Sequence, residues 1–161
     1  MSLVVRALVA GFTLAALSLS VPAQTTLDPA IVGFKLPDQI AWKDNPSGNR
    51  TAVLQGDPSK SGPYAVLLQW LPGKMSRPHF HPDERYCLVL RGTWYTGESK
   101  EWVTDKAKLV GLKPGEYMRH PAAGPHYDGA LDEDVGVAIS GYGPTSATVI
   151  DGGELFGAVP K

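Results

Sequence analysis

The chain has 161 residues, with 15 basic and 16 acidic side chains and a formal net charge of −1. This length predicts a single domain, and the lack of a Lys/Arg run excludes a typical nucleic-acid-binding protein. Cys87 is the only cysteine, so an internal disulfide is excluded as well. The 18 glycines and 14 prolines favour short strands with many turns over helices.

The N-terminal segment has the layout of a secretory signal peptide. Arg6 is its only cation, residues 7–19 are apolar and uncharged, and Val21-Pro22-Ala23 offers small residues at the usual cleavage position. The apolar run is too short to span a bilayer comfortably. We therefore expect residues 1–23 to be a signal peptide and the mature protein to be periplasmic or secreted. After cleavage no second apolar stretch approaches membrane length, so no membrane association is expected.

The rest of the chain is predicted to be a barrel of short strands. Residues 24–39 form an extended lead-in, 40–151 the barrel and 152–161 a C-terminal tail. Residues 99–107 allow at most one helical turn. About nine or ten short strands, separated by turn signals, favour an antiparallel sandwich or barrel. In chain order the expected strands are 40–42, 51–55, 64–71, 86–91, 93–96, 108–112, 116–120, 135–140 and 147–150.

Two histidine-containing segments carry the chemistry. His79 and His81 are two residues apart, so in an extended strand both imidazoles project from one face. Imidazole is the commonest protein ligand for Zn, Fe, Cu and Ni, so this pair is half of a metal site. A second polar segment, from His120 to His126, follows about one hairpin pair later.

The spacing of these residues resembles the two motifs of the cupin family, whose small jelly-roll barrels place metal ligands inside the barrel. The resemblance covers roughly residues 50–150. It implies an all-β antiparallel jelly-roll (cupin-like) β-barrel with little or no helix, a divalent metal ion (Fe, Mn or Zn), and a homodimer. Residues at matching positions are Gly73, His79, His81 and Gly92 for the first motif, and Gly115, Pro121 and His126 for the second. The resemblance thus implies His79, His81 and His126 as metal ligands.

Three positions depart from the family pattern. The glutamate of the first motif is replaced by Arg85, with Glu84 one residue earlier; the second motif's glycine is displaced to Gly124; and its asparagine is Ala130. A guanidinium is permanently charged and cannot ligate a metal. Either a bulge turns Glu84 inward as fourth ligand, or Arg85 faces the cavity and holds a substrate carboxylate, or the metal has been lost.

Several neighbours of the motifs have two interpretations. His120 is expected to support the ligands or lie at the surface, with coordination as the alternative. Cys87 points into the barrel if its strand is regular, and is interpreted as a small core residue. Asp83 and Asp128 either orient imidazoles or are solvated loop carboxylates. The tyrosines and tryptophans are expected in the core or at the barrel rim.

Three functions remain open at this point. The favoured hypothesis is an exported metal-dependent cupin acting on a small organic substrate, with oxygenase chemistry preferred over isomerase or decarboxylase chemistry because three histidines with free positions suit non-haem iron. The alternative is a non-catalytic barrel that binds a small molecule or a metal. The third is a structural barrel whose site has decayed. Fold alone does not choose among them.

Overall fold

The computed structural model describes residues 27–28, 30–46 and 48–159. The expected signal peptide, residues 1–23, lies outside the described residues. The chain divides into two units, Met1–Phe34 and Lys35–Lys161. In the described part of the first, the backbone N–H groups of Ile31 and Val32 donate to the carbonyl oxygen of Asp28 at 2.9 Å.

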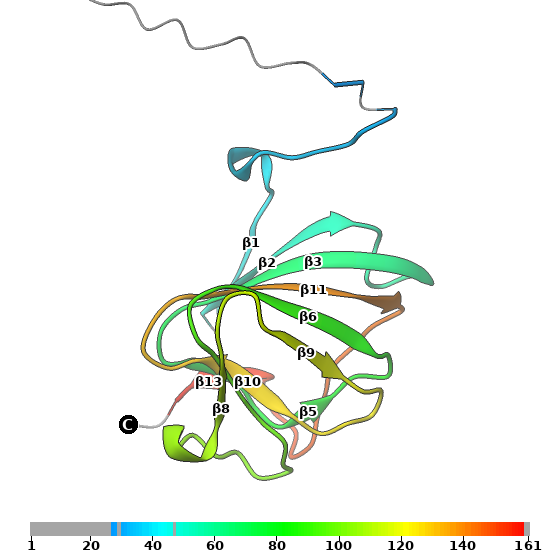
Figure 1. Ribbon diagram of the computed structural model, residues 1–161. Coiled ribbons are helices and arrows are strands. Elements are labelled where there is room, and N and C mark those ends of the chain that lie inside the picture. Colours follow the sequence, from blue (N-terminus) through cyan, green and yellow to red (C-terminus); the bar gives the residue numbers. More distant parts are fainter. Residues whose placement is uncertain (1–26, 29, 47, 160–161) are drawn as a thin grey trace, which may run out of the picture. The chain divides into compact units, whose positions relative to one another are not determined.

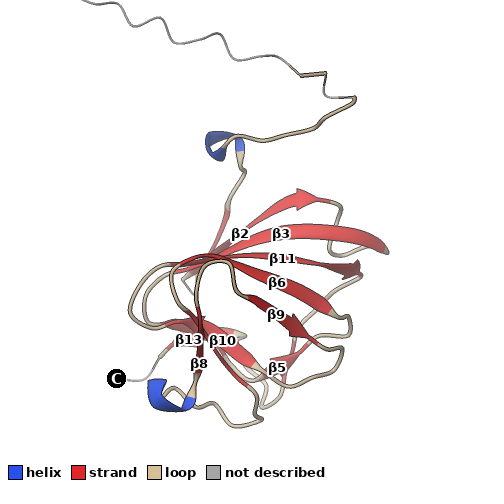
Figure 2. Ribbon diagram, in the orientation of Figure 1, coloured by secondary structure: helices blue, strands red, loops and turns tan. Residues whose placement is uncertain are grey.

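Strands make up nearly all the regular structure of the second unit, as Figure 2 shows. The helical elements among the described residues are two 3₁₀ turns, η1 (Pro37–Gln39) and η2 (Lys106–Lys108). None of the described helices is long and apolar enough to cross a membrane. The strands are β1 (Lys43–Asn45), β2 (Asn49–Gln55), β3 (Gly62–Trp70), β4 (Lys74–Ser76), β5 (His79–Phe80), β6 (Arg85–Arg91), β7 (Trp94–Gly97), β8 (Val110–Leu112), β9 (Tyr117–His120), β10 (Tyr127–Ala130), β11 (Val135–Gly143), β12 (Thr148–Val149) and β13 (Phe156–Ala158).

These strands form two facing sheets and a short two-stranded ribbon (Figure 1). The larger sheet has the order β1-β2-β3-β11-β6-β9, and the smaller has the order β13-β4-β10-β7-β8. The ribbon pairs β12 with β5. Every pairing is antiparallel, and neighbours such as β3 and β11 are far apart in sequence. The all-β antiparallel jelly-roll prediction is confirmed.

The core fills the space between the two sheets because β-branched and aromatic residues alternate along the strands. In β11, Val135, Val137 and Ile139 are buried while the residues between them are less so. In β6, Cys87 and Val89 are likewise the residues whose side chains point into the core. The smaller sheet contributes side chains such as Trp94, which is fully buried.

The structure differs from the sequence-based strand assignment at both ends of the barrel. The first strand lies at Lys43–Asn45 instead of 40–42. The residues assigned to a C-terminal tail contain β13, which pairs with β4 along Phe156–Ala158. The single helical turn allowed within 99–107 is η2, which extends one residue beyond that range, and its N-cap Asp105 accepts a hydrogen bond from the backbone N–H of Ala107.

Candidate metal centre

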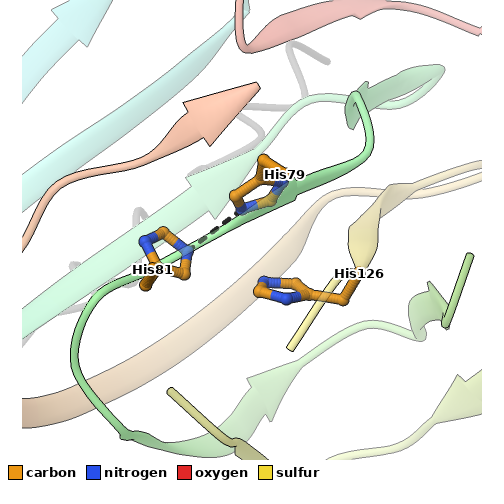
Figure 3. A group of neighbouring side chains, drawn as sticks. All are labelled: His79, His81 and His126. Atoms are coloured by element: carbon orange, nitrogen blue, oxygen red, sulfur yellow. Dashed lines mark hydrogen bonds between the residues drawn. The ribbon is translucent and has the colours of Figure 1, made fainter. Parts of the chain in front are cut away.

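Three histidines converge where β5 meets the start of β10. His79 opens β5, His81 follows it, and His126 immediately precedes β10. His79 and His126 form an antiparallel bridge, in which each backbone N–H donates to the other's carbonyl oxygen at 2.9 Å. Directly opposed residues project from the same face of such a pair. One nitrogen from each of the three imidazoles therefore lies within 4.8 Å of the other two, and the rings face a common space (Figure 3).

Each of these imidazoles is oriented by the same kind of hydrogen bond. A backbone carbonyl oxygen lies 2.7–2.9 Å from every Nδ1 atom. Because a carbonyl only accepts, Nδ1 must carry the hydrogen, which leaves Nε2 with a free lone pair. The three acceptors are the carbonyls of Arg77 for His79, Ser146 for His81 and Gly124 for His126. This tautomer is the one a metal-binding histidine needs.

The free nitrogens are crowded, and among the described residues one of them, Nε2 of His81, receives a hydrogen bond from a protein donor, Nη1 of Arg85. The Nε2 atoms of His79 and His81 are 3.0 Å apart, and Nε2 of His126 is buried without a partner among the described residues. Burial, the main cause, lowers the pKa of His79 to about 4 and that of His81 to about 2, so neither holds an extra proton at neutral pH. A cation between the lone pairs would remove their repulsion. The donor set therefore fits a divalent metal ion.

Arg85 faces these histidines. It begins β6 two residues before Cys87, whose side chain is buried, and therefore lies on the inward face of the strand. Its Nη1 donates to Nε2 of His81 at 2.5 Å, while its Nε is buried without a partner. Among the described residues, no acidic side chain forms a salt bridge with this guanidinium. Arg85 thus lies beside the donor set, and its hydrogen bond to His81 competes with metal binding at that atom.

Glu84 points to a different part of the molecule. Its carboxylate accepts hydrogen bonds from Tyr86 Oη at 2.5 Å and from Arg119 Nη1 at 2.9 Å. It lines a separate surface depression with Tyr64 and Tyr142. The structure therefore does not bring Glu84 to the three histidines, since consecutive residues entering a strand project from opposite faces.

His120 lies in the histidine cluster, although the motif spacing gave it no ligand position. It is 5% exposed, its ring stacks on that of His126 at a centroid distance of 3.7 Å, and both of its nitrogens lack partners among the described residues. Burial, followed by His126, lowers its pKa to about 2. The alternation of side-chain directions along a strand could have predicted its inward position, because Met118 and His120 are the inward-facing residues of β9.

Asp128 and Asp83, the two candidates for orienting imidazoles, differ in position. Asp128 is 4% exposed, and its Oδ2 lies 3.8 Å from Nε2 of His126. With His120 and His126 it forms a second group that could hold a metal. Asp83 instead accepts hydrogen bonds from Tyr64 Oη at 2.8 Å and Thr145 Oγ1 at 2.5 Å. The structure brings only Asp128 to the cluster.

Cys87 is a core residue. It is 1% exposed, and burial raises the pKa of its thiol to about 12. At neutral pH it is therefore a neutral, apolar side chain. Trp70 and Trp94 are fully packed in the core, while Tyr117 and Tyr127 line a cavity.

The histidine cluster borders two cavities. One, of about 250 Å³, lies between the sheets and is lined by His79, His81, Arg85 and Asp128, with apolar walls that include Ile139. The other, of about 870 Å³, is more open. His120 and His126 line the second cavity. Small molecules thus have space on both sides of the cluster.

A jelly-roll barrel with converging histidines defines the cupin class of protein. Residues 34–145 match the family model described as the ChrR cupin-like domain, and the chain belongs to this family. No curated protein matches the chain.

Solved structures agree on the fold. KdgF from Halomonas sp. is 21% identical, with 68% of this chain and 93% of that chain covered at a TM-score of 0.55. The polyketide cyclase RemF from Streptomyces resistomycificus is 15% identical, with 75% and 87% covered at a TM-score of 0.61. An RmlC-like cupin from Shewanella frigidimarina is 15% identical, with 68% and 88% covered at a TM-score of 0.55. At these identities the likeness concerns the fold alone.

Proposed function

We propose that this chain is an exported cupin that binds one divalent metal through His79, His81 and His126 and acts there on a small organic substrate. The observation that carries the proposal is the convergence of three Nε2 lone pairs, each fixed by an Nδ1 hydrogen bond to a backbone carbonyl. A bound iron or manganese ion would supply Lewis-acid or O₂-activating chemistry. Oxygenase chemistry is the preferred class, because three histidine ligands leave coordination positions free.

The chain's own residues would orient the substrate and exclude water. Val66, Leu68 and Ile139 form apolar walls of the smaller cavity. Arg85 supplies a positive charge at its polar end, and Asp128 a buried carboxylate. A buried carboxylate beside a substrate can accept or return a proton during a reaction. Apolar walls with a few polar groups are typical of small-molecule sites.

Metal content tests the proposal. Untagged mature protein, purified from the periplasm, is analysed by elemental mass spectrometry beside His79→Ala and Glu84→Gln. We expect near-stoichiometric iron or manganese in the wild type and its loss in His79→Ala, followed by oxygen consumption with small organic acids. Glu84→Gln is the matched control and should retain the metal, because its carboxylate contacts Tyr86 and Arg119.

Other outcomes of the metal assay discriminate among functions. Zinc in place of iron or manganese would favour isomerase or hydrolytic chemistry over an oxygenase. Metal retention without turnover of any tested acid would favour the non-catalytic binding barrel. Absence of metal, even after reconstitution, would contradict the proposal.

Export belongs to the proposal and rests on the sequence of residues 1–23. Fractionation of cells that express the full chain should recover the protein outside the cytoplasm. N-terminal sequencing should begin at Gln24. A cytoplasmic protein that starts at Met1 or Ser2 would contradict this part.

A homodimer is also proposed, and the outer face of the larger sheet supports it. Tyr86, Leu88 and Leu90 alternate with the buried residues of β6 and are 44%, 41% and 50% exposed. Tyr117 on the adjacent β9 is 57% exposed. Such a patch is typical of an interaction surface. Light scattering coupled to size-exclusion chromatography should give twice the mature mass, and Leu88→Lys should give the monomer.

A further inference from the structure

Arg85 is a cation that forms no salt bridge with any carboxylate of the described residues. Its backbone is paired on both sides, with Gly141 of β11 and His120 of β9, so its side chain starts from the interior face of the larger sheet. The guanidinium lines the smaller cavity, where Nε is buried and unpartnered. No salt bridge to it is found among the described residues, and its one acceptor is the neutral imidazole of His81. Charged groups inside proteins are ordinarily paired, because desolvation of an unpaired charge is costly.

His120 is a second and independent indication of a ligand site. Its side chain is buried, with 5% of the residue exposed, yet neither ring nitrogen has a hydrogen-bond partner among the described residues. A neutral imidazole always carries one N–H donor. Since Arg85 and His120 are directly opposed on β6 and β9, their side chains leave the sheet from the same face. The cluster therefore holds unused donors on two neighbouring residues, of which Arg85 lines the smaller cavity and His120 the larger one, and the Arg85 donors call for an acceptor in the smaller cavity.

The smaller cavity restricts what that acceptor can be. Its volume of about 250 Å³ admits only a small molecule. Beyond the polar end its lining includes Val66, Leu68 and Ile139, which favour an apolar body. The Asp128 carboxylate in the same lining would repel a second anionic group. A guanidinium presents N–H groups in a fork that matches a carboxylate.

We propose that the ligand is a small monocarboxylate with a short apolar body, whose carboxylate takes the N–H groups of Arg85 beside the histidine cluster. This names the substrate class of the proposed function and rests on it, although the anion site itself uses Arg85 and not the metal. It also accounts for an arginine at the position where the cupin pattern has a glutamate. The carboxylate draws the guanidinium away from Nε2 of His81, so anion and metal binding support each other.

The test is titration calorimetry of the full mature protein with sodium propionate, in metal-loaded and metal-depleted samples whose metal content is measured. Sodium chloride keeps the ionic strength equal in all titrations. Propionamide serves as the neutral analogue and succinate as the dicarboxylate. We expect propionate to bind at least about tenfold more tightly than either, as a charge-assisted hydrogen-bonded pair predicts.

Variants locate the site. Arg85→Met should weaken propionate binding at least about tenfold, and Arg85→Lys should fall between it and the wild type because the charge remains but the fork is lost. Arg91→Met is the matched control on the same strand, since Arg91 pairs with Asp134 at the surface; it should bind propionate as the wild type does. Circular dichroism establishes that each variant is folded.

The two proposals fail separately. Two results would overturn the carboxylate site and leave the metal centre standing. One is metal-loaded wild type that binds propionate no more tightly than propionamide. The other is a folded Arg85→Met variant that binds propionate as tightly as the wild type does. Propionate binding that depends on Arg85 in protein that never holds metal would support the carboxylate site and contradict the proposed function. Stronger binding of succinate than of propionate would overturn the restriction to monocarboxylates.

Discussion

The Nε2 atoms of His79 and His81 lie 3.0 Å apart, although both carry lone pairs. The tautomers follow from the Nδ1 atoms, each of which donates to a backbone carbonyl at 2.7 Å. Two lone pairs at this distance repel each other in a buried site, where water does not screen them. A metal ion bound between the two atoms, in place of the Arg85 N–H group that donates to Nε2 of His81, would remove this repulsion, and this sets the first prediction.

Metal is expected to stabilise the folded protein. Adding the metal identified in the purified protein to a chelator-treated sample should raise the free energy of unfolding by about 4 kcal/mol at a concentration a thousandfold above Kd. The shift should be absent in His79→Ala and present in Glu84→Gln. Urea unfolding with and without metal measures it, and an equal shift in His79→Ala would show that the metal binds elsewhere.

The two glycines of the first motif are expected to differ in their tolerance of alanine. Gly73 and Gly92 have nearly the same backbone angle, with φ of +70° and +71°. A Cβ at Gly73 meets no atom within 4 Å, whereas one at Gly92 would overlap the carbonyl oxygen of Asp134. Gly73→Ala should cost about 1–2 kcal/mol for the left-handed conformation, and Gly92→Ala at least about twice that.

Thermal unfolding of the two variants checks this difference. Because the conformational cost is shared, Gly73→Ala is the control for Gly92→Ala. Equal losses of stability would mean that backbone conformation alone explains both glycines.

The sequence predicted much of the site because side-chain direction has a period of two in strands. His79 and His81 were expected on one face, and the structure places them together with His126. That they bind metal stays a prediction. The direction of Arg85 could not be predicted, since Pro82 and Asp83 precede β6 and a bulge there would have reversed it. Pairing with β9 and β11 decides the direction, and those partners are 30 or more residues away.

Long-range pairing also explains what the sequence did not reveal about the ends of the barrel. β13 is three residues long and follows a glycine-containing segment, so its own residues carry little strand signal. It forms because β4 offers an edge to it. Burial of His120 depends likewise on the pairing of β9 with β6, which places it opposite Arg85.

Cys87 is expected to lower the free energy of unfolding as the pH rises into the alkaline range. Burial raises the pKa of its thiol from 9.0 to about 12. Above pH 9 the unfolded chain therefore loses this proton while the folded chain keeps it, so the stability from the neutral thiol is full below pH 9 and declines as the pH rises toward 12. The decline is about 1.4 kcal/mol per pH unit once the unfolded thiol is ionised.

Comparison with Cys87→Ala isolates this thiol from the tyrosines and lysines that titrate in the same range. The difference in unfolding free energy between wild type and variant, measured by urea unfolding at pH 8 and pH 10, should shrink by about 1 kcal/mol. In the folded wild type at pH 8 the thiol should also resist iodoacetamide. A constant difference, or rapid alkylation, would show that the thiol is accessible to water.

Phe156 tests whether β13 is an integral strand of the barrel. Its ring meets Trp70 edge to face, with centroids 5.1 Å apart and an interplanar angle of 83°, and it packs against the core from the smaller sheet. Phe156→Ala should reduce the free energy of unfolding by about 2–4 kcal/mol, since a partly buried aromatic side chain and an aromatic pair are lost. Phe156→Leu should lose less free energy of unfolding.

Tyr142→Ala is the exposed control, because Tyr142 is 63% exposed, and it should change the free energy of unfolding by less than about 0.5 kcal/mol. If Phe156→Ala were as mild as Tyr142→Ala, residues 152–161 would behave as the C-terminal tail that the sequence suggested.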